Sequence, residues 1–271
     1  MDAVTGDAAS EKRATAEEKL ERGFSARYQG DINNARNQSA NIPPTQSCSL
    51  FLTNLPAGTT EKVLLDALSL QGKFGRVMQT HVTPAGEDDR FPTAAAKLIM
   101  AARAEAERVY ELVSAGLFAI QGAVIKAVWN RVLAAPEDGP EYFSRTLVIQ
   151  GPHEVAGVHR LDGFLRGMVK YDTQDVYVLR ERKDERTIVW VFGSFRAQAQ
   201  VARMAIKRRW PGLNVKFGPD PLDVGACAFG KYLLQVNGTG ERPPVVAAAP
   251  VGGDHGRGGQ QYGGGEDGSW F

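Results

Sequence analysis

The sequence predicts an α+β fold in which one unit occurs twice in tandem. Short apolar strands begin near Ser49 and Thr146, and the apolar periodicity after each of them changes in the same order. That order is strand, helix, strand, strand, helix, strand, in roughly 80 residues per copy. Between the copies, Pro136, Gly139 and Pro140 give the chain the composition of a linker.

Size and composition agree with two domains. With 271 residues, of which 43% are apolar and 23% are charged, the chain can bury two separate cores. We expect an arm at residues 1 to 45, a first domain at 46 to 132, a linker at 133 to 143, a second domain at 144 to 219 and a tail at 220 to 271.

The first copy can be followed from its periodicity and its capping residues. Thr59 or Thr60 is expected to cap the first helix, and Gly72 to end it. An acidic turn at residues 86 to 89 separates the two middle strands, and Gly122 precedes the last strand. The expected elements are a strand from 49 ending in a turn at 54 to 56, a helix to 71, strands at 77 to 82 and 93 to 100, a helix at 101 to 114 and a strand at 123 to 129.

The second copy repeats this pattern after the linker. Its first strand is expected to be closed by Gly151 and Pro152. The expected elements are strands at 146 to 150, 175 to 182, 186 to 192 and 213 to 217, with helices at 155 to 169 and 198 to 209.

Both ends of the chain are poor in core-forming patterns. The arm contains one expected helix, from about Ser10 to Arg22, whose apolar face is too thin to fold alone, so we expect disorder or conditional helicity. The tail is rich in Gly, Pro and Ala after a short apolar piece at residues 226 to 236. It contains one Arg-Gly-Gly sequence, at residues 257 to 259, and composition favours a disordered linker over a weak RNA contact there.

Several classes of protein find no support in the sequence. No apolar run approaches the roughly 18 residues of a membrane span, and the polar start does not resemble a signal peptide, so an intracellular location, nuclear or cytoplasmic, is expected. Cys48 and Cys227 have no CxxC partners, and the four histidines have no metal-ligand spacing, so we expect buried or half-buried thiols and no metal. Without nucleophile or phosphate-binding motifs, we expect neither an enzyme nor a cofactor.

Charge is unevenly distributed along the chain. The net charge of the whole chain is +1. Residues 46 to 131 hold 9 Lys and Arg against 8 Asp and Glu, whereas residues 141 to 217 hold 14 against 8. The second half is therefore the basic one, with a net charge of +6, which favours an anionic partner there.

The first strand carries a motif of a known family. Residues 50 to 55, Leu-Phe-Leu-Thr-Asn-Leu, fill every specified position of an aliphatic-aromatic-aliphatic-x-Asn-Leu pattern. This pattern resembles the first motif of the RNA recognition motif (RRM) family, which implies a ferredoxin-like fold that binds single-stranded RNA on the open face of its sheet. The resemblance implies that Phe51 stacks on a base. Thr53 shares its face, because side chains alternate along a strand.

The third strand departs from the family. Aligning the eight-residue second motif of the RRM family to residues 93 to 100, with Ala106 as the start of the helix, puts Ala95 and Lys97 where the family has stacking aromatics. The first copy thus keeps one stacking residue of three. Lys97 is expected to offer a phosphate contact instead.

The second copy departs further from the family. Val148 stands at the first-strand stacking position, and Gly151 and Pro152 replace the Asn-Leu pair. On the third strand, the spacing to Ala199 predicts that Trp190 points inward, which leaves Thr187, Val189 and Val191 on the open face. A register slip of one residue would reverse this assignment.

A basic hairpin joins the second and third strands of the second copy. It suits sequence-independent contacts to a nucleic-acid backbone, although a solvated hairpin tip, partly neutralised by Glu181, Asp184 and Glu185, explains the same charges. The candidate RNA-binding residues of the whole chain are Phe51, Thr53, Asn54, Lys97, Arg131, Arg180, Arg182, Lys183 and Arg186.

Two functions follow from the sequence. The first is an RNA-binding protein, with single-stranded RNA on the sheet of the first copy and backbone contacts from the second. The second is a protein-interaction scaffold built on degenerate RRM folds, which binds partners through sheet faces or helices. The complete first motif and the basic second copy favour RNA, whereas the missing aromatics favour the scaffold. Neither function involves a membrane or a small-molecule substrate.

Overall fold

The computed structural model describes residues 15–22, 32–33, 39–86, 92–140 and 142–223. One compact unit, residues 41 to 255, holds both copies of the repeated pattern. Helix α1 (Ala16–Glu21) belongs to the other unit and starts at a capping box, in which Thr15 and Glu18 satisfy each other's backbone N–H groups. This helix is shorter than the one predicted from about residue 10, and residues 10 to 14 lie outside the described part.

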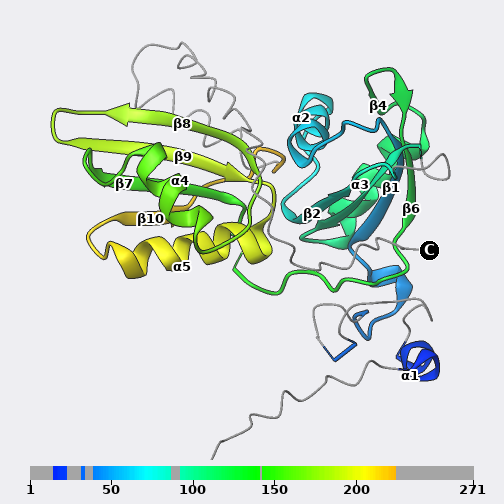
Figure 1. Cartoon of the computed structure of the whole chain (residues 1–271). Coiled ribbons are helices and arrows are strands. Elements are labelled where there is room, and N and C mark those ends of the chain that lie inside the picture. The colour runs from blue at the N-terminus through cyan, green and yellow to red at the C-terminus, as the bar shows by residue number, and fades with distance from the viewer. Residues whose placement is uncertain (1–14, 23–31, 34–38, 87–91, 141, 224–271) are drawn as a thin grey trace, which may run out of the picture. The chain divides into compact units, whose positions relative to one another are not determined.

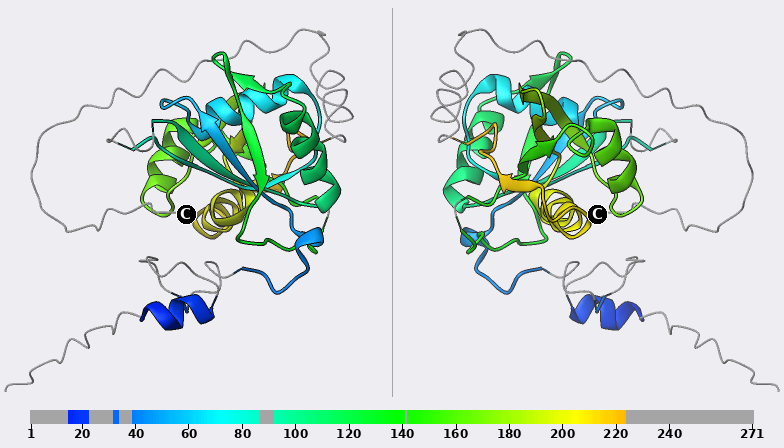
Figure 2. Two further views of the ribbon diagram at one scale, coloured as in Figure 1. Left: turned by 90° about the vertical axis from the view of Figure 1, so that its right-hand side faces the viewer. Right: turned by 90° about the vertical axis from the view of Figure 1, so that its left-hand side faces the viewer.

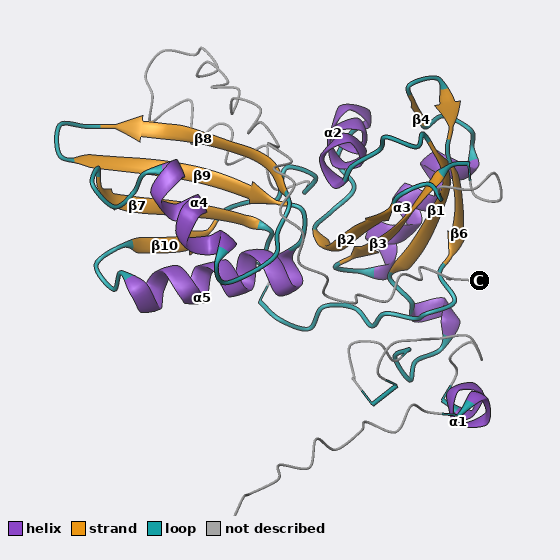
Figure 3. Cartoon of the chain, in the orientation of Figure 1, coloured by secondary structure: helices purple, strands orange, loops and turns teal. Residues whose placement is uncertain are grey.

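The first copy is a four-stranded antiparallel sheet with two helices on one face (Figures 1 and 3). Its strand order is β2-β3-β1-β6, as the prediction of a ferredoxin-like unit requires. Leu50, Leu52 and Leu98 pack from the sheet against Leu64, Leu68 and Val109 from the helices. The elements are β1 (Ser49–Leu55), α2 (Glu61–Gln71), β2 (Val77–Thr83), β3 (Ala94–Met100), α3 (Arg103–Ser114) and β6 (Lys126–Trp129), preceded by a 3-10 turn, η2 (Pro44–Gln46).

Capping residues act as predicted around α2. The Thr60 hydroxyl accepts the N–H of Val63. Gly72 follows the last residue with φ +149°, a conformation that other residues rarely adopt.

The predicted last strand of the first copy is interrupted. Gln121 and Gly122 both have positive φ, which is the geometry of a tight hairpin turn. This turn pairs β5 (Ala123–Val124) with β4 (Ala119–Ile120). Only β6, starting at Lys126, pairs with β1, so the prediction of one strand from 123 to 129 is wrong at its start.

The second copy has the same topology, with strand order β10-β7-β9-β8 and helices α4 and α5 on one face (Figures 1 and 2). Its core includes Leu147, Ile149, Trp190 and Phe192 from the sheet and Ile206 from α5. The elements are β7 (Thr146–Pro152), α4 (Val158–Arg166), β8 (Thr173–Glu181), β9 (Glu185–Phe192), a π-helical turn η3 (Phe195–Ala199), α5 (Gln200–Arg209) and β10 (Asn214–Phe217).

Two predicted boundaries in the second copy are wrong. Gly151 and Pro152 do not close the first strand but continue it, opposite Arg186 and Glu185. Pro152 is tolerated because it is the last residue of the strand. The first helix starts at Val158, since the Pro152 carbonyl accepts two N–H groups in a turn that precedes the helix.

Apolar residues from both copies form one further cluster, which we call the junction cluster. Met78 and Ile99 come from the first sheet, Phe195 comes from η3, and Phe143 lies in the predicted linker. The Phe143 and Phe195 rings stack with centroids 5.3 Å apart. The full cluster is Cys48, Met78, Ile99, Ala101, Ala134 and Phe195, with Phe143 and Phe217 packed against it.

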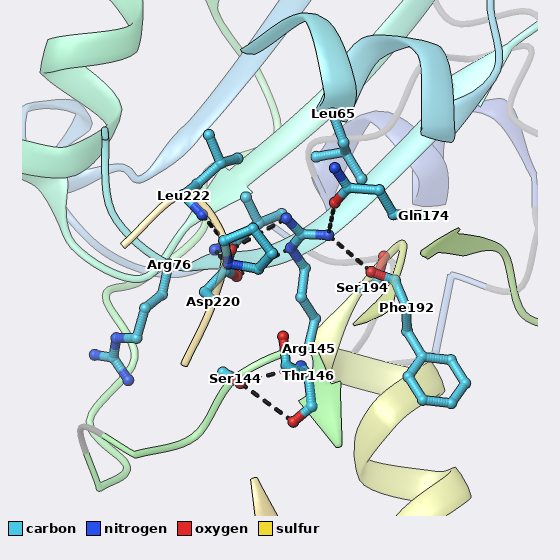
Figure 4. A network of polar contacts seen from close by, with 12 residues as sticks. Leu65, Arg76, Ser144, Arg145, Thr146, Gln174, Phe192, Ser194, Asp220 and Leu222 are labelled. Carbon is cyan, nitrogen blue, oxygen red and sulfur yellow. Dashed lines mark hydrogen bonds and ion pairs between the residues drawn. The ribbon is translucent and has the colours of Figure 1, made fainter. Parts of the chain in front are cut away.

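A buried polar network joins the copies as well (Figure 4). The guanidinium of Arg145 contacts the carboxylate of Asp220, the side chain of Gln174 and the carbonyl of Phe192. Asp220 in turn accepts the N–H of Val77 at the start of β2, 3.0 Å away. The network therefore connects the start of the second copy and Asp220, the first residue of the predicted tail, to the first sheet.

The predicted linker is held by specific contacts. The Ala134 carbonyl accepts the N–H of Cys48, and the N–H of Glu137 donates to the Ala101 carbonyl. The Glu137 carboxylate pairs with Arg196 at 3.0 Å. The described residues of this segment have no helix or strand, and these contacts fix them against both copies.

Candidate functional site

Phe51 lies on the open face of the first sheet, which we define as the face opposite the helices. Its neighbours Leu50 and Leu52 point into the core, so alternation puts the Phe51 ring on the other side. In the sheet register Phe51 stands opposite Lys97 on β3 and Val128 on β6. The predicted orientations of Phe51 and Lys97 are therefore confirmed, and both side chains are half-buried.

A row of side chains crosses this face over all four strands. His81 on β2 is opposite Lys97, which is opposite Phe51, which is opposite Val128. His81 was not among the predicted site residues, although alternation along β2 from the buried Val82 puts its exposed ring on this face.

A second row lies next to it. Thr53, predicted to share the face of Phe51, stands opposite the exposed Lys126. Lys126 was not among the predicted site residues, although it lies in the predicted strand. With Lys97 and Lys126, the open face carries two cations close to one aromatic ring.

Two further candidates lie away from this surface. Asn54 adopts φ +64°, and its side-chain amide donates to the Val124 carbonyl, which ties the end of β1 to the β4–β5 hairpin. Arg131 is exposed two residues after the end of β6, at the same end of the sheet as Ser49. The structure thus gives Asn54 a structural hydrogen bond and does not bring Arg131 next to Phe51.

The other end of the same face is covered. Ile99 stands opposite Ser49, one period along the strands from Lys97, and it packs in the junction cluster with Phe195. Among the described residues, the part of this face left uncovered by the junction cluster is therefore the end that carries Phe51 and Thr53. This limit is invisible in the sequence, because Phe195 is about 100 residues away from Ile99 along the chain.

Burial lowers the pKa of the Lys97 ammonium, because the half-buried position disfavours the charged form. Among the described residues no carboxylate forms an ion pair with Lys97. A phosphate at this position would supply the missing counter-charge.

The open face of the second sheet carries little that could stack on a base. Trp190 is in the core, as the spacing argument predicted, and Thr187, Val189 and Val191 point to the open face. The missed aromatic is Tyr177 on β8, opposite Val189. Its phenol pKa is raised, mainly by burial and also by the nearby Asp175 carboxylate.

The basic hairpin is divided between two faces. Arg180 stands opposite Thr187 and shares the open face, whereas Arg186, one residue earlier on β9, points to the other face. Arg186 forms an ion pair with Glu181 at 2.5 Å. Arg182 and Lys183 are exposed at the tip. Only part of the predicted basic surface is therefore available to one ligand strand.

The described residues contain neither a group of three or more His, Cys, Asp or Glu side chains able to hold a metal ion nor a helix that is long and apolar enough to cross a membrane.

No protein-family model and no curated protein matches the sequence. Among solved structures, RNA recognition domains 1 and 2 of Sex-lethal from Drosophila melanogaster are 14% identical, with 63% of this chain and 99% of that chain covered and a TM-score of 0.24. The Sxl-lethal protein/RNA complex is 14% identical, with 64% and 99% covered and a TM-score of 0.24. The C-terminal RNA recognition motif of RBM19 is 13% identical, with 38% and 92% covered and a TM-score of 0.28.

The topology of the two sheets itself assigns the fold. In each copy the first strand lies between the third and the fourth, the second strand is at the edge, and two helices cover one face. This is the ferredoxin-like arrangement of an RRM-type α+β domain.

Proposed function

We propose that the protein binds single-stranded RNA on the open face of its first sheet, with Phe51 stacked on one base. The observation that carries the proposal is the pairing of Phe51 and Lys97 across β1 and β3 on that face. An aromatic ring meets the flat surface of an unpaired base, and an ammonium group beside it suits the phosphate of the same nucleotide. His81 and Lys126 extend this surface to either side.

The junction cluster limits the length of RNA that the first sheet holds. Because Ile99 and Met78 are covered by Phe195, the accessible part of the face consists of the rows through Phe51 and Thr53. We therefore propose a short contact of few nucleotides on the first copy, with modest affinity.

The second copy contributes charge in this proposal. Arg180 on the open face, with Arg182 and Lys183 at the exposed tip, provides contacts to phosphates that carry no sequence information. The proposed domains are residues 46 to 132 and 144 to 219. The contacts of Arg145, Asp220 and Phe195 between them support a tandem that acts as one body.

A protein-interaction scaffold is the second candidate. The observation that favours it is exposed apolar surface on the first copy, where Leu117, Val124 and Val128 are 69%, 48% and 55% exposed. Such surface suits a partner protein more than a phosphate backbone.

Binding of the full chain to a pool of random single-stranded RNA, measured by fluorescence anisotropy at two salt concentrations, tests the proposal. We expect binding that weakens as salt rises, and weaker binding to double-stranded RNA, whose bases are stacked. Absence of binding at the lower salt concentration would favour the scaffold.

A further inference from the structure

Four exposed cations lie on α4 and α5, the two helices that cover one face of the second sheet (Figure 1). The helices contact each other, and Phe164 of α4 packs against Trp210, which follows α5, with ring centroids 4.9 Å apart. In these two helices, both fully described, the one acidic residue is Asp162, and Arg166 pairs with it at 2.7 Å. The exposed cations that have no ion pair among the described residues are Arg160, Lys207, Arg208 and Arg209.

The helix dipole explains only part of this arrangement. Lys207, Arg208 and Arg209 are in the last turn of α5, where cations suit the negative end of the helix. Arg160 is the third residue of α4, in a first turn without acidic residues, and a cation there opposes the dipole. Its guanidinium lies 6.0 Å from the centroid of the Trp210 ring, and that of Arg209 lies 5.4 Å from the same centroid. Like charges are therefore held together at a position where α4 disfavours a cation.

Apolar side chains are exposed on α5 next to these cations. Met204 is 64% exposed and Val201 is 36% exposed. Residues three or four apart share a helix face, so Val201 and Met204 form a stripe that continues into Lys207 and Arg208. We call the following six exposed side chains the helix surface: Arg160, Val201, Met204, Lys207, Arg208 and Arg209.

The middle of α4 leaves room for a close approach. Gly163 is exposed, and a Cβ at this position would meet no atom within 4 Å. Its φ is not positive, so the fold requires neither the small size nor the special backbone of glycine there. Glycine in a helix interior is less stable than alanine, and a partner that contacts the backbone of α4 would account for it.

We propose that the helix surface binds an acidic amphipathic helix of a partner protein. Its cations suit carboxylates, and Met204 and Val201 suit apolar side chains, since the unbranched Met side chain adapts to the shape of a partner. RNA is the weaker candidate, because the ring beside the cations, that of Trp210, is half-buried with Phe164 packed against it, whereas a base needs an exposed ring. The helix surface is on the side of the second sheet opposite its open face, so the proposal does not rest on RNA binding.

Peptide binding to the full chain tests the proposal. The probe is a fluorescent peptide of about 18 residues, or five helical turns, in which glutamates surround leucines at helical spacing. One control peptide has alanine in place of each leucine, and another has lysine in place of each glutamate. Fluorescence anisotropy near 0.15 M salt measures the affinities, because charges more than about 8 Å apart are then screened. We expect the probe to bind several-fold more tightly than either control peptide.

The test variant carries Arg160→Glu and Met204→Glu. Both positions are exposed, and a glutamate in the first turn of α4 suits the helix dipole, so the fold should be retained. The matched control carries Arg131→Glu and Leu70→Glu, which make the same change of charge at exposed positions of the first copy. We expect the test variant to bind the probe about tenfold more weakly than the wild type and the control to bind it equally well. The test variant should keep the RNA affinity of the wild type.

Three results would overturn the proposal. One is a probe affinity no higher than that of the alanine peptide, and another is an equal loss of probe binding in the test and control variants. The third is a loss of RNA binding in the test variant as large as its loss of peptide binding, which would identify a nucleic-acid contact. Met204→Glu alone replaces the double variant if unfolding curves show that the double variant does not fold. Binding of the probe by a protein that does not bind RNA would contradict the proposed function alone.

Discussion

Arg145 and Asp220 form an ion pair at 3.0 Å in which neither side chain has any exposed surface. The same Asp220 carboxylate accepts the N–H of Val77 in the first sheet, and one of its oxygens accepts the N–H of Leu222. Leu222 itself packs into the core of the first copy. A single buried carboxylate, at the first residue of the predicted tail, therefore links Arg145 of the second copy to the first sheet (Figure 4).

Removing this carboxylate should destabilise the protein strongly. Asp220→Ala leaves the Arg145 guanidinium buried without its counter-charge, so we expect the free energy of unfolding to fall by about 3 to 5 kcal/mol. Glu107→Ala, which breaks the more exposed ion pair with Arg103, should cost at most about 1 kcal/mol. Equilibrium denaturant unfolding measures both. Equal losses in the two variants would contradict a structural role for the buried pair.

Cys48 provides a probe of the contact between the copies. Burial in the junction cluster raises the pKa of its thiol to about 11, so very little thiolate is present in the folded protein near pH 8. In a Cys227→Ser background we expect Cys48 to be alkylated far more slowly in the native protein than in denaturant. Asp220→Ala should accelerate this alkylation, because the junction cluster around Cys48 would open to solvent more often. Native alkylation as fast as that of the unfolded chain would show that the junction does not form.

We expect the half-buried Lys97 ammonium to lower the free energy of unfolding of the RNA-free protein and to strengthen RNA binding. Its pKa is lower when folded than when unfolded, so the unfolded chain binds more protons between the two pKa values. Stability should therefore rise as pH increases from the lowered pKa of Lys97 towards the ordinary value of about 10.4, and Lys97→Met should remove this rise.

At neutral pH, Lys97→Met should raise the free energy of unfolding and weaken RNA binding. Lys126→Met, at an exposed position on the same face, should change stability by no more than about 0.5 kcal/mol. Unfolding curves and RNA titrations of both variants provide the measurement. A destabilised Lys97→Met protein would refute the argument from burial.

Arg182 and Lys183, at the tip of the basic hairpin, should account for part of the salt dependence of RNA affinity. Each lost phosphate contact makes the slope of log affinity against log salt shallower by about 0.7 for a single strand. Arg182→Ala with Lys183→Ala should show this effect, and Arg186→Ala should show less of it because Glu181 already pairs with Arg186. Lys207→Ala with Arg208→Ala, at the exposed end of α5, serves as the control. An unchanged slope in the tip variant would identify a solvated hairpin.

The order of elements was predictable because each element carries its own local signal. Alternation along β1 identified Phe51 as an open-face residue, and Thr60 and Gly72 marked the ends of α2. The orientation of Trp190 followed from counting residues to the next helix. These are short-range properties, in which a few adjacent residues decide the outcome.

The extent of the candidate site was not predictable, because it depends on contacts between distant residues. Nothing local to Ile99 shows that Phe195 covers it, and nothing local to Arg145 shows that Asp220 is its partner. The β4–β5 hairpin was missed for a different reason: the turn at Gln121 and Gly122 was interpreted as the start of a strand. The hydrogen bond of Asn54 to Val124 depends on that hairpin and could not be foreseen without it.

The central claim concerns the ring of Phe51, and one variant measured in two ways tests it most directly. Phe51→Ala should cost about 1 to 3 kcal/mol of binding free energy for single-stranded RNA, the contribution of one base on an aromatic ring. Its free energy of unfolding should fall by much less than the ~3 to 5 kcal/mol expected for Phe118→Ala, which removes a fully buried core aromatic. RNA affinity that is unchanged by Phe51→Ala, in a protein that binds RNA, would contradict the account.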